Sequence, residues 1–165
     1  MKTVRSNKLT KITASVALGL GVVAGANAVD ETFKAQLRIL SPITITEDQL
    51  MDFGETPQGV ANNIEATDLN NKYAAFTVNG DASKTATASV AQTSIEMLTG
   101  DGVGTTKRVT VDTFSVGVGG ALGGDQLDFS GGAVSDVRVY GTARQEAEDI
   151  AGLYTGDLTF QVVYN

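Results

Sequence analysis

The chain has 165 residues, of which 19 are acidic and 12 are lysine or arginine, so its formal net charge is −7. It contains no histidine and no cysteine, which excludes disulfide bonds, zinc sites built from those residues and nucleophiles activated by a histidine. The acidic balance argues against nucleic acid as a partner, because affinity for nucleic acid depends largely on neutralising phosphates.

Residues 1–28 have the pattern of a secretory signal peptide. Four basic residues and no acid precede residue 12, an apolar stretch covers 12–25, and Ala-Asn-Ala follows at 26–28. A basic start, an apolar centre and a small-x-small cleavage site are typical of export signals, and the apolar stretch is shorter than the ~20 residues that span a bilayer. We expect export through the periplasm to the cell surface or an extracellular fibre. The mature chain, 29–165, would have no membrane span and a strongly negative charge.

The first mature segment, 33–40, alternates in polarity. Phe33, Ala35, Leu37 and Ile39 fall on one parity, which predicts an extended strand with one apolar face. Pro42 then predicts a sharp bend before a strand that begins with Ile-Thr-Ile-Thr. A further short strand is expected at 50–54, closed by Gly54, and a polar connection at 55–71.

Residues 72–91 predict a β-hairpin, because Asn79-Gly80 lies between two alternating segments and suits a tight turn. Strands are expected at 93–98 and 107–118. In the second of these, the apolar parity switches between Val111 and Phe114, which predicts a β-bulge near Asp112 and Thr113.

The last third of the chain predicts a strand at 133–141, a short acidic helix at 142–152 and a final strand at 153–164. In that final strand the apolar residues Leu158, Phe160, Val162 and Tyr164 share one parity, as in a strand with one buried face. Seven or eight short strands separated by turn signals predict a single all-β domain, an antiparallel immunoglobulin-like β-sandwich.

No motif in the mature chain predicts catalysis or a cofactor. The glycine-rich run at 117–124 lacks the βαβ surroundings of a nucleotide site and predicts a loop. Asp125 and Asp128 partly match a calcium-binding repeat, but such repeats need stacked copies to complete the oxygen shell. Calcium or glycan binding by the loops at 119–132 therefore stays an alternative, and we expect a non-enzymatic protein.

The two ends of the mature chain also carry a resemblance. Tyr164 is the penultimate residue and Gly152 is the fourteenth from the end; in both respects the chain resembles pilin subunits assembled by the chaperone–usher pathway. The body is similar to a family of secreted, pilin-like bacterial β-sandwich domains of unknown function, through Pro-Ile-Thr-Ile-Thr at 42–46, Asp-Phe-Gly at 52–54 and the run Tyr-Thr-Gly to Tyr at 154–164.

The resemblance implies a fibre subunit that lacks one strand of its sandwich. A periplasmic chaperone and an outer-membrane usher would be transient partners, and the N-terminal segment of the next subunit would then supply the strand, giving a homo-oligomeric fibre for adhesion or biofilm formation. Phe33, Ala35, Leu37 and Ile39 would be the donated residues. The assembly strand would consist of Gly152, Leu158, Phe160, Val162 and Tyr164. The alternative is a self-contained secreted binding domain in which 33–40 is simply the first strand.

Overall fold

The computed structural model describes residues 31–99 and 107–165, with the side chains of 121–122 left aside. The predicted signal peptide, 1–28, lies outside the described residues. Residues 38–165 form one compact unit, and 31–37 belong to a second unit that is described separately. Within the described ranges, no helix is long and apolar enough to cross a membrane.

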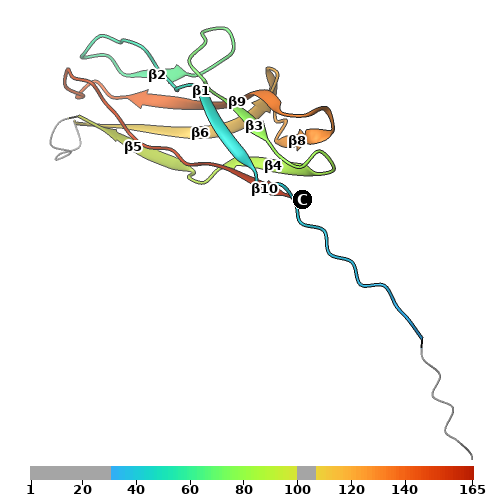
Figure 1. The fold of residues 1–165 in the computed structure, drawn as a ribbon. Coiled ribbons are helices and arrows are strands. Elements are labelled where there is room, and N and C mark those ends of the chain that lie inside the picture. Colours follow the sequence, from blue (N-terminus) through green and yellow to red (C-terminus); the bar gives the residue numbers. More distant parts are fainter. Residues whose placement is uncertain (1–30, 100–106) are drawn as a thin grey trace, which may run out of the picture. The chain divides into compact units, whose positions relative to one another are not determined.

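Two antiparallel sheets make up the compact unit (Figure 1). The larger sheet has the order β1-β3-β9-β6-β5, with β2 added to β9 and β7 added to β6. Its strands are β1 (Thr44–Gln49), β2 (Asn62–Glu65), β3 (Ala74–Asn79), β5 (Ser94–Leu98), β6 (Arg108–Val118), β7 (Ala121–Leu122) and β9 (Val134–Gln145). The smaller sheet has the order β10-β4-β8 and consists of β4 (Thr85–Val90), β8 (Gln126–Asp128) and β10 (Phe160–Tyr164). The all-β prediction is confirmed, with more strands than the seven or eight expected.

The main core lies between the two sheets. The larger sheet contributes Val78, Val116 and Val137, and the smaller sheet contributes Ala86 and Leu127. Alternation along each strand places these residues on the inner face. The cluster therefore joins the sheets as a sandwich, with a core built mainly of small and branched residues.

A second apolar cluster lies on the part of the larger sheet that the smaller sheet does not contact. Val109 and Val111 of β6 and Ala143 of β9 pack there with Phe53 and Ala66, and none of the residues in this cluster comes from β4, β8 or β10. The segments around Phe53 and Tyr154 cover it instead.

The β-bulge expected in β6 is confirmed. The pairing of β6 with β9 shifts register between Asp112 and Ser115, and Thr113 has a φ of 58°. The extra residue restores the parity, so that Val111 and Val116 face the same side of the sheet although they are an odd number of residues apart.

The hairpin expected at Asn79-Gly80 is wrong. β3 belongs to the larger sheet and β4 to the smaller one, so this connection crosses between sheets. Neither Asn79 nor Gly80 has the positive φ of a tight hairpin turn. Gly80 is needed for another reason: a Cβ there would lie 2.6 Å from the ring of Phe129.

The short helix expected at 142–152 is also wrong. β9 continues to Gln145, because its last residues pair with β2 and Arg144 is also opposite Thr110 of β6. Pairing on both sides outweighs a weak helical preference. The acidic residues that suggested a helix form a turn, in which the Asp149 N–H donates to the Glu146 carbonyl at 3.2 Å.

Two further expected strands are absent from the described residues. The run at 50–54 forms a turn, because Gly54 has a φ of 74° and its N–H donates to the Asp52 carboxylate at 2.8 Å. The N-terminal segment carries no strand before β1, which begins at Thr44. The structure therefore does not support the interpretation of 33–40 as the first strand of a self-contained sandwich.

Candidate functional site

Of the final strand expected at 153–164, only Phe160–Tyr164 is strand (β10), and it contributes one face to the core, as its alternation predicted. It pairs antiparallel with β4 from Phe160 opposite Val90 to Tyr164 opposite Ala86. Phe160, Val162 and Tyr164 are half-buried against the main core, whereas Val163 on the other face is 65% exposed.

Aromatic contacts fix β10 to the rest of the sandwich. The Phe160 ring stacks on Phe76 of the larger sheet, with 4.4 Å between centroids and an interplanar angle of 8°. The Tyr164 ring meets Phe129 edge-on at 6.1 Å. Each such pair adds about 0.5–1.5 kcal/mol beyond its buried area, so the strand is well anchored on its inner face.

The outer edge of β10 has no partner strand within the described ranges, since β10 ends the order of the smaller sheet. Thr159 accepts from the Ala91 N–H at 2.9 Å, and the Asn165 N–H donates to Thr85 at 3.1 Å, both toward β4. Backbone groups alternate in direction along a strand. The N–H and C=O groups of Phe160, Val162 and Tyr164 therefore face away from β4.

The segment before β10 joins the larger sheet. Leu98 of β5 and Thr155 exchange two backbone hydrogen bonds, of 2.8 and 3.0 Å. Gly156 lies against β5, and a Cβ on Gly152 would lie 2.6 Å from Thr99 Oγ1. Gly152 thus has a packing role beside β5. Leu158, which follows the contact at Thr155 and precedes β10 in the sequence, is half-buried.

The predicted donor residues are solvent-exposed. Phe33, Leu37 and Ile39 are 90%, 87% and 84% exposed, and Ala35 is exposed as well. The three large apolar side chains of this segment therefore stand in solvent at every second or fourth position.

Residues 38–41 are held at the turn between β3 and β4. Arg38 donates to Asp81 at 3.3 Å and to Ser83, and the Ser41 N–H donates to Asp81 at 3.3 Å. Tyr164 Oη donates to the Ser41 carbonyl at 2.8 Å and accepts from the Asp81 N–H at 2.6 Å. Hydrogen bonds from Ser83 and then Ser41 lower the pKa of Asp81 to about 2.

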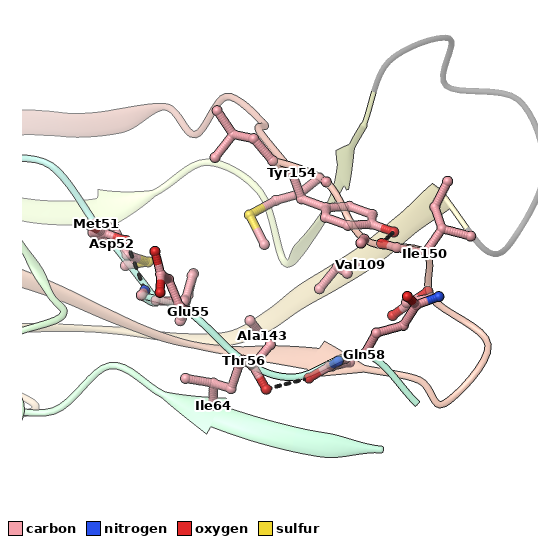
Figure 2. Close-up of a pocket in the computed structure, with 18 residues that line it drawn as sticks. Met51, Asp52, Glu55, Thr56, Gln58, Ile64, Val109, Ala143, Ile150 and Tyr154 are labelled. Atoms are coloured by element: carbon pink, nitrogen blue, oxygen red, sulfur yellow. Dashed lines mark hydrogen bonds between the residues drawn. The ribbon is translucent and has the colours of Figure 1, made fainter. Parts of the chain in front are cut away.

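A pocket of about 520 Å³ opens beside the second apolar cluster (Figure 2). Its lining comes from the turn that follows β1, from the inner face of the larger sheet and from the segment 149–154. Tyr154, whose hydroxyl donates to the Ile150 carbonyl at 2.9 Å, lies along it (Figure 2). Asp149 also lines it and is 3% exposed.

A polar cluster centred on Arg138 lies on the outer face of the larger sheet. The guanidinium pairs with Asp136 and Asp68, each at 2.6 Å, and sits 4.4 Å from the centroid of the Tyr73 ring. Burial and the hydrogen bond to Asp68 raise the pKa of Tyr140 to about 12. Ion pairs, a hydrogen bond and the cation–π contact thus join Arg138, Asp136, Asp68, Tyr140 and Tyr73 into one network.

The acidic loops at 119–132 make local contacts in the structure. Asp128 accepts from the Ser130 N–H at 2.9 Å and begins a short 3-10 helix, η2 (Phe129–Gly131). No group of three or more acidic residues that could hold a metal occurs in the part of the chain that the structure describes. The calcium alternative gains no support from this geometry.

Sequence reasoning missed the pocket and the Arg138 cluster. Asp149 is one of several acids in the run 144–149, and nothing in the pattern distinguishes it from its exposed neighbours. Arg138 and Asp68 are 70 residues apart, so only the folded chain brings them together.

No protein-family model, curated protein or solved structure matches this chain.

Proposed function

We propose that the protein is an exported structural subunit of a surface fibre, in which residues 33–39 of one copy add to the outer edge of β10 in the next. The observation that carries this proposal is the edge of β10. Within residues 31–99 and 107–165, no strand lies opposite its backbone groups at Phe160, Val162 and Tyr164, while its side chains already face an apolar core.

The N-terminal segment has the pattern that such an edge accepts. An added strand gains main-chain hydrogen bonds along the edge, and its alternate side chains supply affinity and specificity. Phe33, Leu37 and Ile39 are exposed, and burying a large apolar side chain contributes about 1.5–3 kcal/mol. The half-buried side chains of β10 would be covered at the same time.

The position of Ser41 favours donation from a second copy. Because Tyr164 contacts Ser41, the segment preceding Ser41 in the same chain could lie along β10 only in the parallel sense. A segment from another copy can lie antiparallel, which is slightly more stable for each residue. Head-to-tail donation is a heterologous contact, which produces a filament where the rotation between successive copies does not close into a ring.

The remaining parts of the proposal come from the resemblance and the sequence. They are the immunoglobulin-like topology, the signal peptide of residues 1–28, a periplasmic chaperone that covers the edge in transit, an outer-membrane usher, and a role in adhesion or biofilm formation.

The second candidate function is that of a self-contained secreted binding domain. It is favoured by the compactness of residues 38–165 without an added strand.

A pair of matched variants tests the fibre proposal. Leu37→Asp places a charge on the donated face, and Gln36→Asp places the same group on the opposite parity. In the mature chain, 29–165, we expect heat-labile, SDS-resistant ladders and filaments for wild type and Gln36→Asp, and none for Leu37→Asp or for a chain lacking 29–40. Assembly by the truncated chain, or a stable wild-type monomer whose residues 33–40 are protected from hydrogen exchange, would falsify the proposal.

A further inference from the structure

Asp149 carries a carboxylate oxygen that has no hydrogen-bond partner among residues 31–99 and 107–165. Its Oδ2 accepts from the Glu146 N–H at 2.8 Å, but its Oδ1 is buried and makes no hydrogen bond. The residue as a whole is 3% exposed. A buried carboxylate with an unsatisfied oxygen is costly and rare in native proteins, so it calls for a donor from outside the chain.

The pocket beside Asp149 has a negative charge and apolar walls. Asp52, Glu55 and Asp149 line it, and its lining residues, all within the described ranges, include no lysine or arginine. Of the neighbouring cations, Lys72 donates to the Phe53 carbonyl at 2.5 Å. Arg108 and Arg144 border an adjacent pocket that Asp149 also lines, and they pair with Glu96 and Asp112. Met51 and Met97 are among the apolar lining residues (Figure 2 labels Met51).

The negative charge and the apolar lining of the pocket together restrict which kind of ligand could bind. A neutral hydroxyl would satisfy Oδ1 but would leave the charge unbalanced. A bare metal ion needs several oxygen ligands, and the described residues hold no group of three acids close enough to provide them. An ammonium group supplies up to three N–H donors and a positive charge.

The walls favour a ligand whose ammonium is attached to an aliphatic stem. Methionine side chains adapt to flexible apolar groups, and the volume of about 520 Å³ lies in the range of small-molecule sites. Tyr154 and Asp149 both line the pocket. Burial and then the charge of Asp149 raise the pKa of the Tyr154 phenol, against smaller lowering effects from the Ile150 carbonyl and the charge of Lys107. The ring and the carboxylate therefore lie in one site.

We propose that this pocket binds a primary ammonium on an aliphatic stem, with the ammonium donating to Asp149 Oδ1 and the stem packing on Met51, Met97 and Tyr154. Such a group could come from a free alkylamine or from a lysine side chain of another protein. The proposal does not depend on fibre assembly, because the pocket is built from residues 51–154 and does not include β10.

Calorimetric titration of the purified protein tests the proposal. The probes are 1,5-diaminopentane, a short peptide with a single lysine, 1-pentanol and tetramethylammonium. We expect saturable binding of the first two probes only, since pentanol lacks the charge and tetramethylammonium lacks N–H donors. Tighter binding of the peptide would assign the site to a protein lysine, and tighter binding of the diamine to a free amine. Equal binding of all four probes, or of none, overturns the proposal.

The matched variants are Asp149→Asn and Glu148→Gln. Glu148 is exposed and lies in the same turn, so its variant removes the same charge without touching the buried oxygen. We expect affinity for the amine to fall at least about tenfold in Asp149→Asn and to stay within about twofold in Glu148→Gln. Because Asp149→Asn can impair folding, methyl NMR of the wild-type protein gives an independent reading. Shifts at the Met51 and Met97 methyls on adding the diamine support the site, and shifts confined to other regions contradict it.

Discussion

The hydroxyl of Tyr164 donates to the backbone carbonyl of Ser41, with 2.8 Å between the two oxygens. This bond joins the last residues of β10 to the chain just before β1, and it places the exit of the N-terminal segment beside the edge that we propose as its acceptor in a neighbouring copy.

Tyr164→Phe should weaken this junction while keeping the ring against Phe129. The variant removes the bond to Ser41 and leaves the Asp81 N–H without its acceptor. We expect the free energy of unfolding to fall by about 1–2 kcal/mol, measured by urea denaturation. Val163→Ala, at an exposed position of the same strand, should change it by less than about 0.5 kcal/mol.

The stabilising effect of Asp81 should disappear in strong acid. Its pKa is lowered from 3.8 to about 2 in the folded protein, so its contribution is complete above the unfolded value and is lost as the pH falls through 2. Asp81→Asn should therefore be less stable than wild type at pH 6 and nearly equal to it at pH 1.5. A difference that is the same at both pH values would show that the carboxylate charge is not the cause.

Gly80→Ala should destabilise the sandwich, because the new Cβ would lie 2.6–2.9 Å from three ring carbons of the fully buried Phe129. Overpacking of this kind typically costs about 1–3 kcal/mol. Gly131→Ala is the matched control, since a Cβ there meets nothing within 4 Å and its φ is not in the left-handed region. Thermal denaturation of both variants measures the contrast, and equal melting temperatures would contradict it.

Among the positions of β6 that are not already glycine, Thr113 should tolerate a change to glycine best. Its φ of 58° costs a β-branched residue about 1–2 kcal/mol, which glycine would relieve, although the variant loses the hydrogen bond from Thr113 to Asp112. We expect Thr113→Gly to leave stability unchanged or to raise it slightly. Thr110→Gly, in regular strand, should lower it by about 1 kcal/mol. Chemical denaturation ranks the two variants, and the reverse order would rule out strain at the bulge.

Local patterns in the sequence predicted those features that a single strand determines. The parity switch between Val111 and Phe114 located the bulge, and the alternation of β10 identified which of its side chains face the core. Both follow from the geometry of one strand, so no knowledge of its neighbours was needed.

Features that depend on pairing between distant segments were not predictable in this way. Asn79-Gly80 has the composition of a hairpin turn, yet β3 and β4 pair with different partners. The segment at 142–145 became strand because β2 and β6 supply hydrogen bonds on both sides. The buried position of Asp149 likewise depends on packing that brings separate segments together, and no local pattern encodes it.

The path of residues 152–164 has a mechanical consequence. This segment bonds first to β5 at Thr155 and then to β4 along β10, so it is attached to both sheets. In a fibre whose subunits are linked by a strand along β10, tension would act parallel to that strand. The ladder bonds would be loaded together in shear and would not open one after another, and part of the force would pass through Thr155 into the larger sheet.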